Sequence, residues 1–133
     1  MKKLFNVRTL LLLLAVCLIS IPAIASGDKP EITFSETRHE FGTIKASAGT
    51  VSATYRFTNT GSAPLVIITV TNGGCGCTTP SYPKHPIAPG KSGEITIHFD
   101  PSGRRGEFNR EVKVKTNASK KRIGLRFSGA IIP

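Results

Sequence analysis

Apolar and polar residues alternate along most of the chain beyond residue 30. The clearest case is TVSATYRFTN, residues 50–59, where Val51, Ala53, Tyr55 and Phe57 share one side and polar residues take the other. Because successive side chains of a β-strand point to opposite faces, this alternation predicts a strand with one buried face. The same pattern predicts strands in EITFS (31–35), GEITIHFD (93–100), REVKVKT (110–116) and RIGLRFSGAI (122–131).

One segment departs from this alternation, and turn-like segments separate the strands. PLVIITVT, residues 64–71, is a continuous run rich in β-branched residues, which favours a strand covered on both faces. NTGSAP, APGKSG, DPSGRRG and TNASKK lie between the apolar runs and have the composition of turns. About seven short strands in about 100 residues predict an all-β fold, an immunoglobulin-like antiparallel β-sandwich. A closed barrel is the alternative.

The N-terminal segment differs from the rest of the chain. MKKLFNVR is basic, TLLLLLAVCLISIPAI is apolar, and Ala23-Ile24-Ala25 fits a small-residue cleavage site. This order of features predicts a cleaved signal peptide over residues 1–25 and one sandwich domain over residues 26–133. An uncleaved anchor is the weaker alternative, since Pro22 interrupts a run that is short for a spanning helix. We therefore expect a periplasmic or secreted protein with no transmembrane segment in the mature chain.

The charge balance is strongly basic. The chain has 18 Lys and Arg against 8 Asp and Glu. Cleavage removes Lys2, Lys3 and Arg8, which leaves 15 basic against 8 acidic residues, a net charge of +7. In an exported protein this balance favours contact with anionic surfaces or glycans, or serves solubility alone, whereas a nucleic-acid partner is not expected. Lys113, Lys115 and Arg126, with Arg122, form a basic face if the last two strands pair as a hairpin. We interpret this face either as a binding surface or as the protection of an exposed sheet edge.

Cysteine chemistry is confined to one glycine-rich turn once Cys17 leaves with the signal peptide. Cys75 and Cys77 flank Gly76, and an even pair in an oxidising compartment favours a disulfide. Such a disulfide stabilises the fold only weakly. Closing a three-residue loop in the unfolded chain contributes about 1.6 kcal/mol of stability, against about 3 kcal/mol for a fifteen-residue loop.

Other interpretations of the cysteine pair stay open at the level of the sequence. The sulfurs fit a small apolar plug at one end of the sandwich. A tight, exposed disulfide also suits thiol–disulfide redox chemistry. A third hypothesis is a Cu(I) site in which two thiolates bind the soft ion and His85 adds a ligand. Structural zinc is not expected, since a closed zinc site needs four ligands.

Several short motifs occur in an order that resembles a known family. They are HEFGTI (39–44), YRFTNTGSAPLVIITV (55–70), GGCGCTTP (73–80), PIAPGKSGEITIHFD (86–100), GEFNREVKVKTN (106–117) and LRFSG (125–129). Together they resemble the bacterial domain-of-unknown-function family 1573, and the Cys-Gly-Cys-Thr segment is the most specific part. The order is also similar to sandwich modules related to major sperm protein and to cilium-associated domains. The resemblance implies an immunoglobulin-like sandwich and export in bacteria, and it implies no established reaction.

No converging nucleophile, base and oxyanion donor is recognisable along the chain, so we expect no catalytic residues and no bound cofactor. The sequence favours an exported, non-catalytic module that binds a protein or an envelope glycan. The two alternatives are periplasmic Cu(I) binding and thiol–disulfide redox chemistry, both through Cys75 and Cys77. The sequence leaves the oligomeric state undetermined.

Overall fold

The computed structural model describes residues 27–133, and the signal peptide predicted for residues 1–25 lies outside these described residues. The described part is built from strands joined by turns and loops, and contains no helix long and apolar enough to cross a membrane. The strands are β1 (Ile32–Phe34), β2 (Arg38–Lys45), β3 (Val51–Asn59), β4 (Ile67–Val70), β5 (Thr78–Ser81), β6 (Ser92–Phe99), β7 (Gly106–Thr116) and β8 (Ser119–Ile132).

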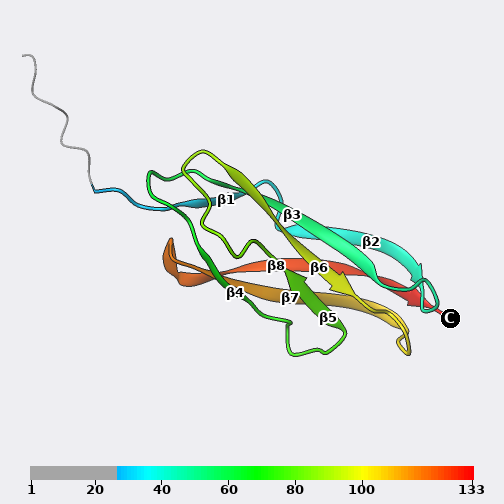
Figure 1. Cartoon of the computed structure of the whole chain (residues 1–133). Coiled ribbons are helices and arrows are strands. Elements are labelled where there is room, and N and C mark those ends of the chain that lie inside the picture. The colour runs from blue at the N-terminus through cyan, green and yellow to red at the C-terminus, as the bar shows by residue number, and fades with distance from the viewer. Residues whose placement is uncertain (1–26) are drawn as a thin grey trace, which may run out of the picture.

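Two four-stranded sheets pack face to face (Figure 1). One has the strand order β1-β3-β6-β5 and the other the order β2-β8-β7-β4. The predicted all-β sandwich is therefore confirmed, with eight strands in place of about seven. All neighbouring strands run antiparallel except β2 and β8, which pair in parallel. The predicted hairpin of the last two strands is formed by β7 and β8.

The core lies between the sheets and consists of the inward-facing positions that the alternation predicted. Every second residue from Ala53 to Phe57 in β3 and from Ile95 to Phe99 in β6 is at most 1% exposed. On the opposite sheet, β7 and β8 contribute four further buried side chains, Val112, Val114, Leu125 and Phe127. Burial of these apolar side chains stabilises the sandwich, because each contributes about 1.5–3 kcal/mol relative to an exposed position.

The expectation that residues 64–71 form a strand covered on both faces is wrong. β4 is only four residues long and lies at the edge of its sheet, with a register irregularity between Ile67 and Thr69. Ile67 and Val70 are buried against the core, whereas the side chain of Ile68 is 49% exposed. A continuous apolar run indicates burial on both faces only where further elements cover the outer face, and here the outer face is open.

Two buried polar side chains tie the layers and loops together. The Tyr55 hydroxyl on β3 donates to the Arg126 carbonyl on β8 at 2.6 Å, which connects the two sheets. Burial raises the pKa of Tyr55 to about 12. Asn59 at the end of β3 donates to the carbonyls of Ala63 (2.8 Å) and Ile87 (2.9 Å) and accepts from the Gly61 N–H (3.0 Å). The loop between β3 and β4 is therefore organised around a side chain with no exposed surface.

Candidate functional sites at the crossover loop and the hairpin end

The segment between β4 and β5 crosses from one sheet to the other and carries both cysteines. It begins with a tight turn in which the Asn72 side chain accepts from the Gly74 N–H at 3.0 Å and the Asn72 carbonyl accepts from the Cys75 N–H at 3.3 Å. Gly73 and Gly74 have φ values of 67° and 79°, which favour glycine. A Cβ on Gly73 would also lie 2.7 Å from the Glu111 carbonyl oxygen. The turn is thus pressed against β7.

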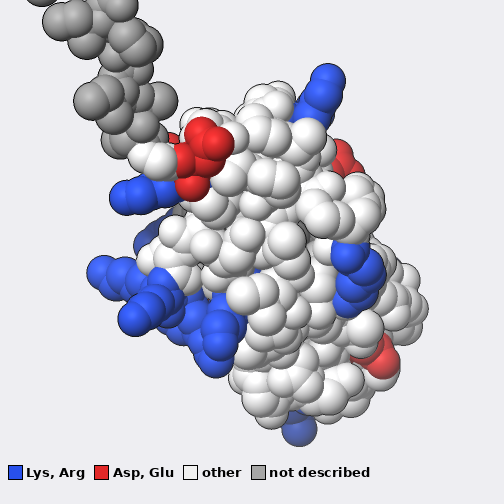
Figure 2. Space-filling view, turned by 60° about the vertical axis from the view of Figure 1, so that its left-hand side comes forward, with Lys and Arg blue, Asp and Glu red and all other residues white. Residues whose placement is uncertain are grey.

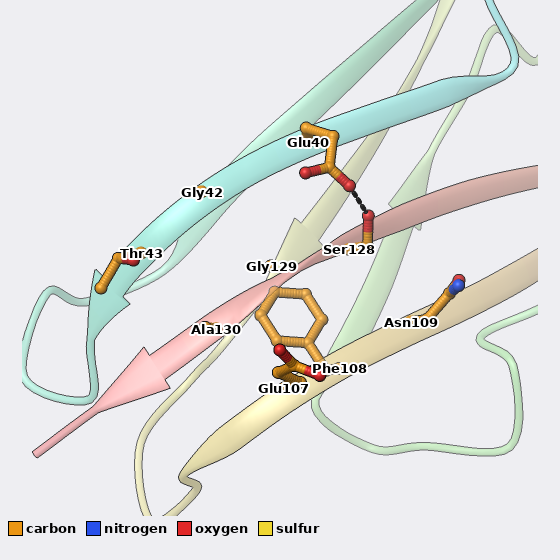
Figure 3. Close-up of a pocket in the computed structure, with 9 residues that line it drawn as sticks. All are labelled: Glu40, Gly42, Thr43, Glu107, Phe108, Asn109, Ser128, Gly129 and Ala130. Atoms are coloured by element: carbon orange, nitrogen blue, oxygen red, sulfur yellow. Dashed lines mark hydrogen bonds between the residues drawn. The ribbon is translucent and has the colours of Figure 1, made fainter.

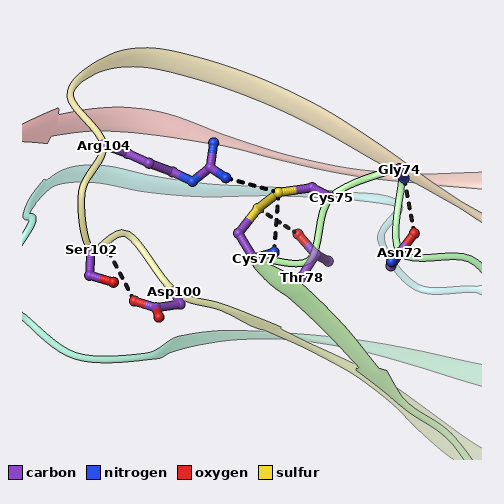
Figure 4. The surroundings of a disulfide bond; sticks show 8 residues. All are labelled: Asn72, Gly74, Cys75, Cys77, Thr78, Asp100, Ser102 and Arg104. Atoms are coloured by element: carbon purple, nitrogen blue, oxygen red, sulfur yellow. Dashed lines mark hydrogen bonds between the residues drawn. A yellow bond between two sulfur atoms is a disulfide. The ribbon is translucent and has the colours of Figure 1, made fainter.

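Cys75 and Cys77 are joined by a disulfide, and both residues are half-buried (Figure 4). The Cys77 N–H donates to Cys75 Sγ at 3.2 Å, and the Thr78 hydroxyl lies 3.5 Å from Cys77 Sγ. Backbone hydrogen bonds hold the loop independently of the sulfurs. The Thr78 N–H donates to the Cys75 carbonyl at 3.2 Å, and the Asp100 N–H donates to the Cys77 carbonyl at 2.9 Å.

Arg104 reaches the disulfide from the turn between β6 and β7. This turn is fixed by the Ser102 N–H, which donates to the Asp100 carboxylate at 3.0 Å, and by the Arg104 N–H, which donates to the Pro101 carbonyl at 3.1 Å. The Arg104 guanidinium Nη2 then lies 3.2 Å from Cys75 Sγ (Figure 4). The pKa of Asp100 is lowered by hydrogen bonds from Ser102 and further by the charge of Arg104.

The composition of DPSGRRG predicted a turn here but not the contact between Arg104 and the disulfide. The sequence does show two adjacent arginines between two glycines, in the turn that follows β6. β6 pairs with β5, which begins directly after Cys77. That signal does not say which arginine points toward the sulfurs. The structure adds Arg104 to the candidate site residues.

His85 is not brought to the cysteine pair. β5 begins directly after Cys77 and carries the chain along β6 toward Ser81, so His85 follows the far end of that strand. In the part of the chain that the structure describes, no three His, Cys, Asp or Glu side chains gather in a group that could hold a metal ion. The three-ligand Cu(I) site proposed from the sequence therefore has its histidine in the wrong place. Copper binding by the two reduced thiols stays a prediction.

The basic face predicted on the last two strands is partly neutralised. Lys113 and Lys115 alternate with the buried residues of β7, and Arg126 does so on β8, so all three lie on the outer face of the sheet. Glu111 lies beside them and forms ion pairs with Lys113 Nζ at 2.6 Å and Arg126 Nη2 at 3.1 Å. The pKa of Glu111 is lowered, first by its hydrogen bond with Lys113 and then by the charge of Arg126. Two of the three predicted cations are thus engaged within the chain.

A second group of cations lies at the end of the β7–β8 hairpin, and we call Lys115, Lys120, Lys121 and Arg122 the hairpin-end cluster. No ion pair among residues 27–133 involves any of these four. Figure 2 shows Lys and Arg side chains projecting together from one side of the molecule.

The backbone of the hairpin end is anchored by Asn117. Its side chain accepts from the Val66 N–H at 2.9 Å and donates to the Pro64 carbonyl at 3.1 Å. These bonds tie the hairpin end to the loop between β3 and β4. The cluster therefore lies at a turn whose backbone is held in place by these hydrogen bonds.

A groove lined by residues of β2, β8 and β7 has a volume of about 550 Å³ (Figure 3). It forms where β2 has a bulge between Glu40 and Thr43, with Gly42 at a φ of 68°. The Ser128 hydroxyl donates to the Glu40 carboxylate inside it. Its lining residues are Glu40, Gly42, Thr43, Glu107, Phe108, Asn109, Ser128, Gly129 and Ala130. Its two carboxylates make the groove locally acidic on a basic protein.

These features define the class as a two-sheet β-sandwich module with a disulfide in the crossover between the sheets and a cationic hairpin end. A family model described as "Protein of unknown function (DUF1573)" matches residues 32–131. The chain therefore belongs to this family, as its motifs predicted. A comparison with curated proteins gives no significant match.

Solved structures share the sandwich. A protein of unknown function from Porphyromonas gingivalis W83 superposes with a TM-score of 0.66 at 19% identity, over 84% of this chain and 51% of that one. The VesB protease of Vibrio cholerae gives 0.61 at 16% identity, over 74% of this chain and 31% of the protease. The chain thus spans about half of the first structure and about a third of the second. At these identities the likeness concerns the fold alone.

Proposed function

We propose that the chain is an exported, non-catalytic module that binds an anionic component of the cell envelope through its hairpin-end cluster. The observation that carries this proposal is the set of four cations, Lys115, Lys120, Lys121 and Arg122, which have no acidic partner among the described residues. No Asp or Glu occurs after Glu111, so every charged side chain among the 22 residues from 112 to 133 is cationic.

Binding would depend on the positive potential that the four cations concentrate at the end of the β7–β8 hairpin. Clustered like charges repel one another, and an anionic ligand that approaches them relieves this repulsion. Because Asn117 fixes the turn between β7 and β8, little backbone ordering is needed when a ligand binds. A projecting end also suits an extended anionic surface, such as an acidic glycan, better than a small enclosed ligand.

The experiment is retention on an immobilised acidic polysaccharide, with a neutral polysaccharide as the reference matrix. The double variant Lys120→Gln/Lys121→Gln should lose most of the retention. The matched control Lys113→Gln/Arg126→Gln removes the same number of charges from the outer face, where Glu111 already engages them, and should lose much less. Retention of the wild type should fall steeply with salt, because exposed charges are screened within about 8 Å at physiological ionic strength. Equal loss in both double variants would mean that net charge, and not the hairpin-end cluster, causes retention.

A further inference from the structure

We propose that Cys75–Cys77 is an exchangeable disulfide that accepts two electrons from a dithiol of a partner protein. In this proposal Cys77 is the sulfur that the partner attacks, and Cys75 leaves as a thiolate held by Arg104. The inference goes beyond the binding function and is independent of it, since the disulfide and the hairpin-end cluster lie near opposite ends of β7.

The two sulfurs have different surroundings, and this difference sets the direction of exchange. Cys75 Sγ accepts from the Arg104 guanidinium at 3.2 Å and from the Cys77 N–H at 3.2 Å. Cys77 Sγ has the neutral Thr78 hydroxyl at 3.5 Å. Negative charge that develops on a leaving sulfur is therefore better stabilised on Cys75, because hydrogen bonds from a charged donor are stronger than those between neutral groups.

The exchange balances with a dithiol as reductant. A thiolate of the partner attacks Cys77 Sγ, the bond between Cys77 Sγ and Cys75 Sγ breaks, and its electron pair stays on Cys75 as a thiolate. A mixed disulfide now joins the partner to Cys77. The partner's second thiolate then attacks its own sulfur in that bond and releases Cys77 as a thiolate. The partner ends as a disulfide, the two protons of its thiols are available to Cys75 and Cys77, and two electrons have moved to this chain.

The loop is built to keep its shape when the sulfurs separate. Four backbone and side-chain hydrogen bonds, from Gly74, Cys75, Thr78 and Asp100, hold the crossover without the disulfide. A bridge that closes so few residues adds little stability through the unfolded chain. Reduction therefore has a small cost in folding, as a repeatedly opened bond requires.

Arg104 is a positioning residue, and Arg105 next to it gives a matched control. Arg105 is exposed and has no hydrogen bond or ion pair with a side chain among residues 27–133. In Arg104→Gln we expect the rate of reduction by dithiothreitol to fall about tenfold, since a charge-assisted hydrogen bond to the leaving sulfur is lost. Arg105→Gln should reduce at nearly the wild-type rate. Unchanged far-ultraviolet spectra and melting temperatures would show that both variants keep the fold.

Two further measurements separate this role from a merely structural one. In the reduced protein, alkylation by iodoacetamide should begin at lower pH for the wild type than for Arg104→Gln, with Arg105→Gln like the wild type. Brief treatment of the oxidised protein with glutathione, followed by acid quenching and alkylation of the released thiol, should place glutathione on Cys77 and the alkyl group on Cys75. Fragment mass spectra distinguish the two positions.

The proposal is overturned if both arginine variants reduce at the wild-type rate, or if glutathione is found mainly on Cys75. Neither result affects retention on an acidic polysaccharide, so a failure here is distinguishable from a failure of the binding function.

Discussion

At the scale of single residues, the Tyr55 hydroxyl gives the sandwich a pH-dependent connection between its sheets. Its pKa of about 12 in the folded protein lies above the ordinary tyrosine value of about 10, so its contribution to stability is complete below about pH 10 and is lost as the pH rises toward 12. A shift of this size corresponds to at most about 3 kcal/mol. We therefore expect wild-type stability to fall between pH 10 and 12 by more than that of Tyr55→Phe.

The same variant has a measurable effect at neutral pH. Tyr55→Phe leaves the Arg126 carbonyl without its 2.6 Å donor and should reduce the free energy of unfolding by about 1–2 kcal/mol. Urea denaturation at pH 7 and pH 11 tests both expectations. A parallel pH dependence in the two proteins would show that groups other than Tyr55 account for alkaline unfolding.

The alternation of the sequence predicted the burial of Tyr55 but not the partner of its hydroxyl. That partner, the Arg126 carbonyl, is 71 residues away in the chain, and a period-two pattern carries no information about distance across the core. The same holds for Arg104, which contacts a cysteine 29 positions earlier. Asn59 ends the strand predicted over residues 50–59 and begins the turn-like segment NTGSAP, but its full burial was not predicted, because turn propensity does not reveal whether a loop folds over a side chain.

At the scale of elements, the crossover loop depends on the glycine that faces β7. Gly73→Ala places a Cβ at 2.7 Å from the Glu111 carbonyl oxygen on a backbone with positive φ, so the loop or the strand must shift. We expect a loss of about 1–3 kcal/mol in the free energy of unfolding. Gly76→Ala is the matched control, because its Cβ meets no atom within 4 Å, and it should change stability by less than about 0.5 kcal/mol. Chemical denaturation of both variants checks this, and equal losses would contradict the packing explanation.

Elements with strict alternation were predictable, and those defined by their neighbours were not. β3, β6, β7 and β8 follow from period-two patterns. β5 is only four residues long and contains Pro80, so its sequence does not predict a strand. It forms because it pairs with the edge of β6 that β3 leaves open. β2 is interrupted by a bulge at Gly42, and its parallel pairing with β8 joins residues 88 positions apart, as in Arg38 with Arg126. The pairing of distant strands depends on the packing of the whole chain.

At the scale of the whole molecule, the two candidate sites should act independently. The disulfide contacts the turn before β7, and the hairpin-end cluster lies around the last residues of β7 and the first residues of β8. The loop that carries the disulfide contacts β7 at Glu111, and the four residues from there to Lys115 span about 13 Å, which exceeds the screening length of about 8 Å at physiological ionic strength. No charged group of one site therefore acts appreciably on the other, and perturbations separated this far are normally additive.

This independence predicts the behaviour of two opposite variants. Cys75→Ser/Cys77→Ser should cost at most about 2 kcal/mol of stability, since a three-residue loop closes little entropy, and should bind an acidic polysaccharide with wild-type salt dependence. Lys120→Gln/Lys121→Gln should lose binding yet keep the wild-type rate of reduction by dithiothreitol, because the charges of the cluster are screened before they reach the disulfide that the dithiothreitol thiolate attacks. Salt titrations of retention and stopped-flow reduction measure the two properties. If reduction of the disulfide alters retention, the sandwich transmits a change along the β7–β8 hairpin, and the two ends belong to a single site.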